Sequence, residues 1–233
     1  MEFTLFKGAV WQLIKHMDWF AIIILIGLFC LSVFCIAIIA FKFVALRQQR
    51  RTLSILMQRI ANSKTIADLA AASKEIQNNV GSALLAQILN ELRQLLDHKQ
   101  STSGEPNKTL RKEDFELLEV ATLQTIDGLL IEEEAYLPIL GTSSSVAPLV
   151  GLFGTIWGLI HAFIDISQEK SADIATVAPG MAEALIITLA GLIVAIPAMI
   201  SFHYFSNELR KIEADLTSIS NKFLALTKQT FVK

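Results

Sequence analysis

The stretch APGMAEALIITLAGLIVAIPAM, residues 178–199, decides the fold of this protein. Its apolar run is long enough to cross the hydrocarbon core of a bilayer, about 30 Å thick, as a helix. One carboxylate, Glu183, lies inside the run. Because an ionised side chain near the bilayer centre costs about 2.5 to 3.5 kcal/mol on insertion scales, such a residue normally has a functional role. Glu183 is therefore the first candidate site residue.

The composition of the whole chain is that of a membrane protein. Of 233 residues, 53% are hydrophobic and only 18% are charged, and the mean hydropathy is +0.51. Residues 19–41 contain no charge, and as a helix they would extend about 34 Å, enough for a first span. This run is longer than the apolar core of a secretory signal, roughly 7 to 15 residues, and no small-residue cleavage site follows it, which favours a retained helix.

Two further apolar segments, 136–165 and 173–205, predict a hairpin of transmembrane helices joined by a short polar turn at 166–172. Basic residues predict the orientation, because loops rich in Lys and Arg stay in the cytoplasm. They gather after the first and third spans, at Lys42, Arg47, Arg50, Arg51, Arg59, Arg210 and Lys211. The sequence thus predicts a short periplasmic segment at 1–18 and cytoplasmic segments at 42–135 and 206–233.

The predicted cytoplasmic segments show helical periodicity and no strand-like alternation. Residues 42–135 are predicted as helices with a loop near 101–110, and from Glu113 onward the chain is predicted to run straight toward the second span. Residues 206–233 are predicted as one helix with an apolar seam comprising Leu209, Ile212, Leu216, Ile219, Phe223 and Leu226. The fold class is therefore an all-α integral membrane protein with three transmembrane helices and long cytoplasmic helical extensions.

An acidic stretch precedes the second span. Between Glu113 and Glu134 there are eight acidic residues and no basic residue. Charge runs are usually solvated helix faces. The alternative is a vestibule that raises the local cation concentration beside a pore. The sequence leaves both interpretations open, because only the placement relative to a pore separates them.

The second and third spans each carry a stripe of small or polar residues at helical spacing. The stripes comprise Ser144, Pro148, Gly151, Thr155, Gly158, Ala162 and Asp165 in the second span, and Gly180, Ala184, Thr188, Gly191, Ala195 and Ala198 in the third. Such stripes, like the Gly154-x-x-x-Gly158 pair, let two helices approach closely without any pore. The other interpretation is a polar pathway, and Glu183, which borders the third-span stripe, favours it.

Counting residues from Glu169 in the turn predicts the depth of the polar groups. Thr155 lies 14 residues before it and Glu183 lies 14 residues after it, so a symmetric hairpin places both at one level. Thr188 lies about 7.5 Å further along the third helix. Hydroxyl groups can donate to a carboxylate or to water, so these residues together predict a proton pathway. Because three spans enclose little space, a cyclic homo-oligomer is expected.

Motifs of catalysis and cofactor binding are missing from the sequence. There is no G-x-S-x-G elbow, no phosphate-binding P-loop and no H-E-x-x-H zinc motif. Cys30 and Cys35 lie in the first span and are interpreted as apolar filler. His161 is interpreted as a packing residue. We expect no enzymatic activity, no cofactor, no metal site and no nucleic-acid partner, and broken inverted repeats typical of solute transporters are not apparent.

Two motifs carry a resemblance to a known family. The segments APLVGLFGTIWGLIHAF (147–163) and APGMAEALIITLAGLIVAIPA (178–198) resemble the second and third transmembrane helices of the MotA/TolQ/ExbB proton channel family, in its TolQ and ExbB branch. By motif position, the pore-lining polar residues of the family correspond to Thr155, Glu183 and Thr188. Its framework positions correspond to Pro148, Gly151, Gly154, Gly158, Gly180 and Pro197, and the stripe residues Ser144, Ala184 and Gly191 are grouped with them.

The resemblance implies a pentamer whose second and third helices line an axial pore in the bacterial inner membrane. That pore would enclose the single transmembrane helices of a TolR-like or ExbD-like partner dimer, which carries an essential aspartate. Proton flow would move the partner and, through a TolA-like or TonB-like energy transducer, do work on the outer membrane. The chain departs from the family at Ile187 and Leu189, where alanine is common, so the local helix packing is expected to differ.

Three functions follow as competing hypotheses. A TolQ-type role in envelope integrity and cell division is favoured by the short N-terminal segment and by the HAF ending of the second-span motif. The alternative is an ExbB-type subunit that energises import by TonB-dependent outer-membrane receptors. A hypothesis of another class is a membrane scaffold that conducts no protons, for which the substitution Glu183→Gln would be silent.

Overall fold

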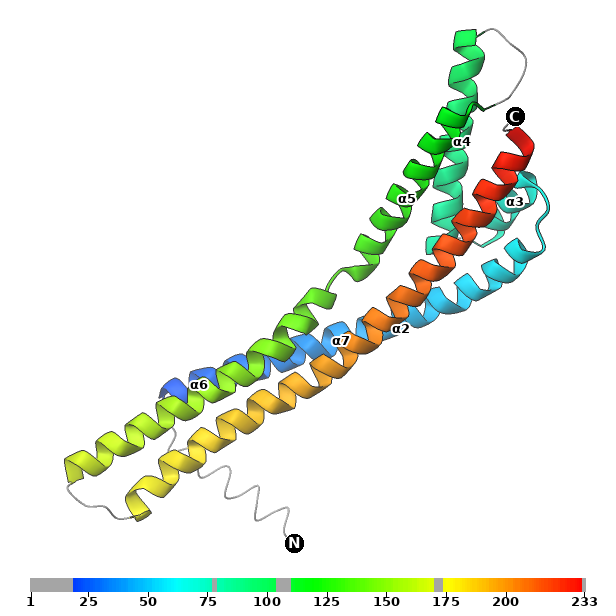
Figure 1. Ribbon diagram of the computed structural model, residues 1–233. Coiled ribbons are helices and arrows are strands. Elements are labelled where there is room, and N and C mark those ends of the chain that lie inside the picture. Colours follow the sequence, from blue (N-terminus) through cyan, green and yellow to red (C-terminus); the bar gives the residue numbers. More distant parts are fainter. Residues whose placement is uncertain (1–18, 77–78, 104–109, 170–173, 232–233) are drawn as a thin grey trace. The chain divides into compact units, whose positions relative to one another are not determined.

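The computed structural model describes residues 19–76, 79–103, 110–169 and 174–231, which form six α-helices (Figure 1). They are α2 (Trp19–Ala61), α3 (Ile66–Glu75), α4 (Val80–Ser103), α5 (Lys112–Glu134), α6 (Leu137–Glu169) and α7 (Ile174–Phe231). No β-strand occurs among these residues, which confirms the predicted helical fold class. The expected segment 1–18, and parts of the expected loop at 101–110 and turn at 166–172, lie outside the described residues.

Three of the helices, α2, α6 and α7, are long and apolar enough to cross a membrane. This confirms the predicted number of spans. Helix α2 has 43 residues and α7 has 58, so each continues beyond the predicted end of its span. Residues 42–61 and 198–231 contain neither Gly nor Pro, the residues that most disfavour a helix interior. The first and third spans are therefore each continuous with the polar segment that follows.

The contacts divide the chain into two compact units. The membrane unit ends at Phe41 and resumes over Tyr136–Tyr204, and the second unit comprises Lys42–Ala135 and resumes at Phe205.

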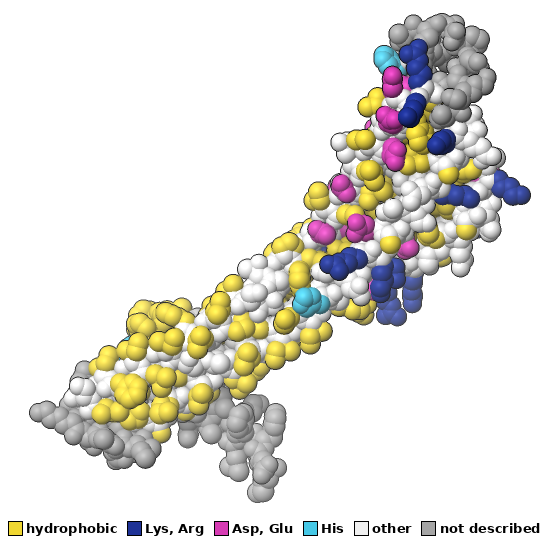
Figure 2. All heavy atoms as spheres, in the orientation of Figure 1, with side chains coloured by type: hydrophobic (Ala, Val, Ile, Leu, Met, Phe, Trp, Pro, Cys, Tyr) yellow, Lys and Arg dark blue, Asp and Glu magenta, His cyan; other side chains and the backbone are white. Residues whose placement is uncertain are grey.

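The membrane unit has a small core and a large apolar surface. Its buried core comprises Ala21 and Leu28 of α2, Ala147 of α6, and Ile187, Val194 and Ala195 of α7. Many larger side chains remain exposed, such as Phe153 at 52% and Leu185 at 67%. Hydrophobic side chains are spread over the visible surface of α6 and of the first half of α7, with few charged side chains among them (Figure 2). Lipid chains or further membrane-embedded copies are what normally cover an apolar surface of this extent.

The second unit is built on the predicted apolar seam of α7. The seam residues are buried, namely Leu209, Ile212, Leu216, Ile219, Phe223 and Leu226, which confirms the prediction. Buried leucines of α2, α4 and α5 belong to the same unit, namely Leu53, Leu56, Leu84, Leu85 and Leu118. Within this unit, α7 therefore turns its polar side outward.

Helix α3 begins at a capping box, as the sequence Thr65-x-x-Asp68 permits. Thr65 Oγ1 accepts a hydrogen bond from the N–H of Asp68 (3.2 Å), and Asp68 Oδ2 accepts from the N–H groups of Thr65 (3.0 Å) and Lys64 (3.1 Å). The Thr65 side chain and then these two N–H groups lower the pKa of Asp68 from its ordinary value, because they stabilise the charged carboxylate. The cap fixes where the chain turns after α2.

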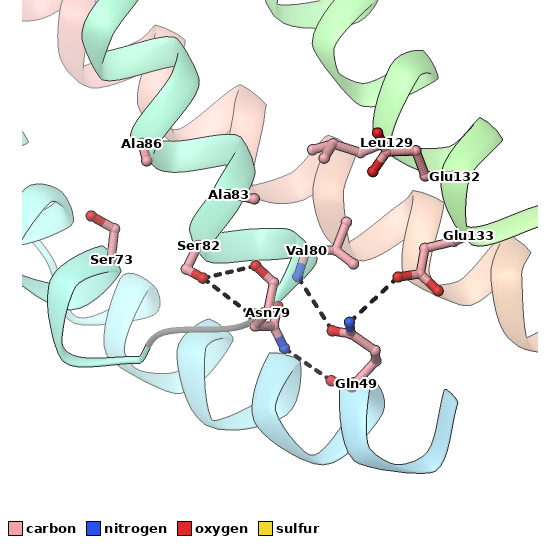
Figure 3. A pocket seen from close by; sticks show the side chains of 10 residues that line it. All are labelled: Gln49, Ser73, Asn79, Val80, Ser82, Ala83, Ala86, Leu129, Glu132 and Glu133. Atoms are coloured by element: carbon pink, nitrogen blue, oxygen red, sulfur yellow. Dashed lines mark hydrogen bonds between the residues drawn. The ribbon is translucent and has the colours of Figure 1, made fainter. Parts of the chain in front are cut away.

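A polar network ties α4 and α5 to α2 within the second unit (Figure 3). Asn79, just before α4, donates its side-chain N–H to the backbone oxygen of Gln49 (3.0 Å). The side chain of Gln49 accepts a hydrogen bond from the N–H of Val80 (3.3 Å) and donates to the carboxylate of Glu133 at the end of α5 (3.4 Å). One glutamine thereby fixes the heights at which α4 and α5 meet α2.

Helices α5 and α6 are separated by a break at Ala135 and Tyr136, where the sequence predicts a straight run into the second span. Tyr136 has φ 71°, in the left-handed region that bulky residues rarely adopt. Lys42 is only 4% exposed, and its Nζ donates a hydrogen bond to the backbone oxygen of Glu133 (2.7 Å). This bond satisfies one of the carbonyl groups left without an intrahelical partner at the end of α5.

Candidate functional site

The two small-residue stripes face each other in the α6–α7 hairpin. A Cβ atom on Gly151 would lie 3.1 Å from Thr188 Cα, and one on Gly191 would lie only 2.6 Å from the backbone oxygen of Ala147. These glycines allow the two backbones to approach closely. The same contact joins Gly158 to Ala184 and Gly180 to Ala162. Within one protomer the stripes therefore serve close helix packing, the first of the two interpretations.

Gly154 and Ile187 form the tightest pair of this contact. A Cβ atom on Gly154 would collide with Ile187 Cγ2 and lie 3.1 Å from Ile187 Cβ. Ile187 is only 2% exposed. The branched side chain that departs from the family pattern thus fills the space that Gly154 leaves. The sequence contains both halves of this pair, but nothing in it links one to the other.

Thr188 links the two helices by a hydrogen bond. Its Oγ1 donates to the backbone oxygen of Gly151 at 2.9 Å. The sequence does not predict this partner, because its pattern favours water or a carboxylate as the acceptor for Thr188. The close approach at Gly151 brings the carbonyl within reach of the hydroxyl, so the bond is a consequence of the glycine packing.

The predicted depths need a correction. In the observed contacts Gly158 is opposite Ala184 and Gly154 is opposite Ile187. Because the two helices are antiparallel, Glu183 is level with about Leu159, whereas Thr155 is level with about Ile186. The two polar groups expected at one level are offset by about three residues, or ~4.5 Å along the helix. The expected equality is wrong because the fit of side chains between α6 and α7, and not the middle of the polar turn, sets the offset of the helices.

Thr155 is held by its own helix. Its Oγ1 donates to the backbone oxygen of Leu152 at 2.7 Å, and the side chain is partly exposed. Ser144 behaves similarly, since its Oγ donates to the oxygen of Gly141 at 2.7 Å. A donor to a preceding carbonyl keeps its oxygen lone pairs available as acceptors.

Glu183 lies on a different face of α7 from Thr188. Ile187 is four residues after Glu183, and Val194 is seven residues after Ile187, so these three side chains share one face. Thr188 is turned away from Glu183 by about 140° around the helix. Ile187 and Val194 belong to the core that α7 shares with α2 and α6, and Glu183 is itself partly buried. Glu183 thus shares a face of α7 with Ile187, which packs against Gly154 of α6, whereas Thr188 bonds to Gly151 of α6 from another face of α7.

The remaining framework residues occupy helix interiors. Pro148 lies inside α6 and Pro197 inside α7. Each proline removes one backbone donor and so weakens the helical ladder locally. The side chain of Asp165, which belongs to the predicted second-span stripe, lies outside the described residues.

An aromatic cluster joins α6 to α2. The ring of Trp157 lies 4.4 Å from that of Phe20 and 4.8 Å from that of His161, measured between centroids. His161 Nδ1 lies 3.2 Å from the backbone oxygen of Trp157. Because a carbonyl only accepts, a hydrogen bond here requires a proton on Nδ1. These contacts agree with the packing role predicted for His161.

The substitution Thr188→Val should weaken the α6–α7 contact, because valine keeps the shape of threonine but cannot donate to Gly151. Hydrogen bonds between membrane helices contribute about 0.6 kcal/mol on average and up to ~1.7 kcal/mol. We expect a loss of this size in the free energy of unfolding, measured by titration with sodium dodecyl sulfate. Thr188→Ser is the matched control and should retain most of the stability. Equal stability of the two variants would contradict a structural role for the hydroxyl.

Comparison with known proteins connects this geometry to a family. The sequence profile of the MotA/TolQ/ExbB proton channel family matches residues 76–218. The chain is 31% identical over 221 residues to the biopolymer transport protein ExbB of Salmonella typhimurium, covering 94% of this chain and 86% of that protein. It is 45% identical over 101 residues to the Tol-Pal system protein TolQ of Haemophilus influenzae, covering 43% and 44% of the two chains. A TolQ of Pseudomonas aeruginosa is 44% identical over 93 residues, covering 40% of each.

Proposed function

Because the chain belongs to the MotA/TolQ/ExbB proton channel family, we propose that it is the proton-harvesting subunit of a motor complex in a bacterial inner membrane. The motor energises a TolR-like or ExbD-like partner, which acts on the outer membrane through a TolA-like or TonB-like transducer. The TolQ-type role is the first candidate, supported by 45% identity to a TolQ over 101 residues, or 43% of the chain. The ExbB-type role is the second candidate, supported by similarity to an ExbB over 94% of the chain.

One observation carries the proposal: a partly buried glutamate lies within the apolar part of α7, a helix that is able to span a membrane. Glu183 shares its helix face with the core residues Ile187 and Val194. A carboxyl group in such surroundings can take up a proton and release it again, which is the minimum requirement of a proton relay. One proton that crosses a potential of 100 mV releases about 2.3 kcal/mol, so a few protons per cycle suffice for a large movement.

The proposal includes the assembly and its orientation. Five copies surround an axial pore, with the N-terminus in the periplasm and the C-terminus in the cytoplasm, and the partner dimer places its own helices inside the pore. The large exposed apolar surface of the membrane unit supports contacts with other copies as well as with lipid. The tight α6–α7 hairpin then acts as a rigid wall element, because glycine contacts leave no room for the two helices to slide.

Within this proposal the three polar residues have separate tasks. Glu183 holds the proton. Thr155 offers an acceptor oxygen on the partly exposed surface of α6. Thr188 keeps α6 and α7 together and so holds the helix that carries Glu183 in place.

The test is proton uptake by the intact complex. The tagged chain is purified from its own membranes with any co-purifying single-span protein, reconstituted into vesicles, and exposed to a potassium diffusion potential. A pH-sensitive dye inside the vesicles should report faster acidification than in protein-free vesicles. Equal rates, with the complex still assembled, would favour the scaffold hypothesis. The periplasmic sequence of the co-purified partner would decide between the TolQ and ExbB roles.

A further inference from the structure

Helix α5 presents a face that the described part of its own chain leaves uncovered. Its buried seam consists of Leu118, Thr122 and Ile126. On the opposite side, four large hydrophobic residues are exposed, namely Leu117 (61%), Val120 (53%), Leu123 (53%) and Ile131 (70%). Exposed acidic residues flank them, namely Glu113, Glu116, Asp127 and Glu134. This set is termed the α5 outer face.

Neither water nor lipid suits the α5 outer face. A solvated helix face is normally polar, and contiguous exposed apolar side chains mark contact surfaces. The interspersed carboxylates would be repelled by the anionic lipids of a cytoplasmic leaflet. A protein surface with small side chains and positive charge is the complementary partner.

Helix α7 offers a surface of mostly small side chains within the second unit, with one positive charge, Arg210, at one end. Six residues line a groove of about 620 Å³ along its outward side, namely Arg210, Glu213, Ala214, Thr217, Ser218 and Asn221. Beyond Tyr204, no large hydrophobic residue of the described part of α7 is exposed. Large side chains of a second helix can therefore enter this groove, as ridges enter grooves in ordinary helix packing. The set is termed the α7 groove.

The distal ends of α5 and α7 lie at matching heights. The N–H of Leu110 donates to the backbone oxygen of Phe231 at 2.7 Å. Lys228 Nζ lies 5.9 Å from the ring centroid of Phe115. The two helices therefore run in opposite directions within the unit, with the start of α5 beside the end of α7.

The end of α5 and the Glu208 region of α7 are aligned with each other through contacts with α2. Gln49 bonds to Glu133, and the next residue, Arg50, forms an ion pair with Glu208 at 3.0 Å. Glu133 and Glu208 are therefore at about the same height. The contacts at both ends give the same alignment of α5 with α7. In this alignment, the positions of Glu134 and Arg210 along the helix axes differ by about three residues, or ~4.5 Å.

We propose that the α5 outer face of one copy packs into the α7 groove of the next copy, with Glu134 beside Arg210 of the neighbouring copy. This inference rests on the cyclic assembly of the proposed function and places both helices along the ring axis. Copies in a ring are related by rotation without translation along that axis, so residues in contact between them have equal heights. The alignment of α5 with α7 within one chain therefore predicts how α5 of one copy is aligned with α7 of the next copy.

Glu134 and Arg210 are the complementary charges in this contact. The described residues form no ion pair with Arg210 or with Glu134 inside the protomer, so each side chain has its charge available to the neighbouring copy. The one carboxylate of the groove, Glu213, lies at the same position along the helix axis as Gly128. Gly128 has no side chain to oppose Glu213, and even a Cβ atom on Gly128 would meet nothing within 4 Å. The acidic stretch of α5 then serves assembly, as an alternative to both a solvated face and a cation vestibule.

Disulfide trapping in membranes tests the proposal with the full-length chain. In a background of Cys30→Ala and Cys35→Ala, one tagged copy carries Glu134→Cys and a differently tagged copy carries Arg210→Cys. Mild oxidation should convert most of the monomer into a disulfide-linked pair that carries both tags, whereas neither variant alone should give a pair. The doubly substituted chain should give a ladder that ends in a closed ring.

In the matched control, Glu113 is changed to cysteine and Glu134 is kept. Glu113→Cys removes the same residue type from the same face of the same helix, but about 32 Å away from the predicted height, so it should not pair with Arg210→Cys. Equal pairing of both combinations, or no pairing by either, would overturn the contact. Charge reversal gives a second measurement: Arg210→Glu should lower the assembled fraction, and Glu134→Arg in the same chain should restore it.

Proton uptake by the same membranes separates the two proposals. Loss of pairing with normal uptake would overturn this contact alone. Specific pairing with no uptake would overturn the proton-harvesting function and leave the contact in place.

Discussion

Glu183→Gln should abolish proton uptake while the complex still assembles. Glutamine has nearly the size of glutamate and can still form hydrogen bonds, but it cannot take up and release a proton at any relevant pH. Groups that transfer protons typically contribute about 10² to 10⁴-fold to a rate, so we expect uptake to fall by at least about 100-fold. The measurement is the rate of internal acidification of vesicles that contain the purified complex.

Two variants control this result. Glu183→Asp retains a carboxyl group at a slightly shorter reach and should keep partial uptake. Glu91→Gln makes the same chemical change on α4, outside the predicted spans, and should leave uptake unchanged. Normal uptake by Glu183→Gln would remove the proton site from this position and favour the scaffold hypothesis.

Gly191→Val should prevent the hairpin from forming. A Cβ atom at this position would already lie 2.6 Å from the backbone oxygen of Ala147, and a backbone atom cannot rotate aside as a side chain can. Overpacking of a tight contact commonly costs about 1 to 3 kcal/mol, and here the branched side chain should reach or exceed the upper value. We expect a large loss of folded protein in the membrane, measured by abundance and by the midpoint of detergent unfolding.

Gly27→Val provides the matched control for this substitution. Gly27 also lies in a helix that is able to span a membrane, but a Cβ atom there would meet nothing within 4 Å. Its valine variant should express and unfold like the parent chain. If both variants behaved alike, the close approach of α6 and α7 would not determine stability.

The fold followed from local patterns in the sequence. The uncharged run at 19–41 and the apolar segments around Glu183 predicted three spans, and the structure has three helices of sufficient length and apolarity. The seam from Leu209 to Leu226 predicted the buried side of α7. Both predictions depend only on helical periodicity, which the backbone imposes wherever its hydrogen bonds close within one segment.

The candidate site could be predicted from the sequence only in part. Glu183 was recognisable because a carboxylate in an apolar helix is rare, and the glycine stripes were recognisable by spacing. The bond from Thr188 to Gly151 and the fit of Ile187 against Gly154 were not. Both involve residues more than thirty positions apart, so no local pattern relates them.

The sequence by itself determined that this chain has three segments able to cross a membrane as helices, which residues could face a core, and where a carboxyl group lies in an apolar segment. It did so because the apolar solvent forces every backbone group to be satisfied inside its own helix. Only the tertiary structure decided the rotation and the offset of α6 against α7, which separated the level of Thr155 from that of Glu183 and turned Thr188 toward α6. These quantities depend on how side chains of different helices fit together, and a close-packed contact is a property of both partners at once.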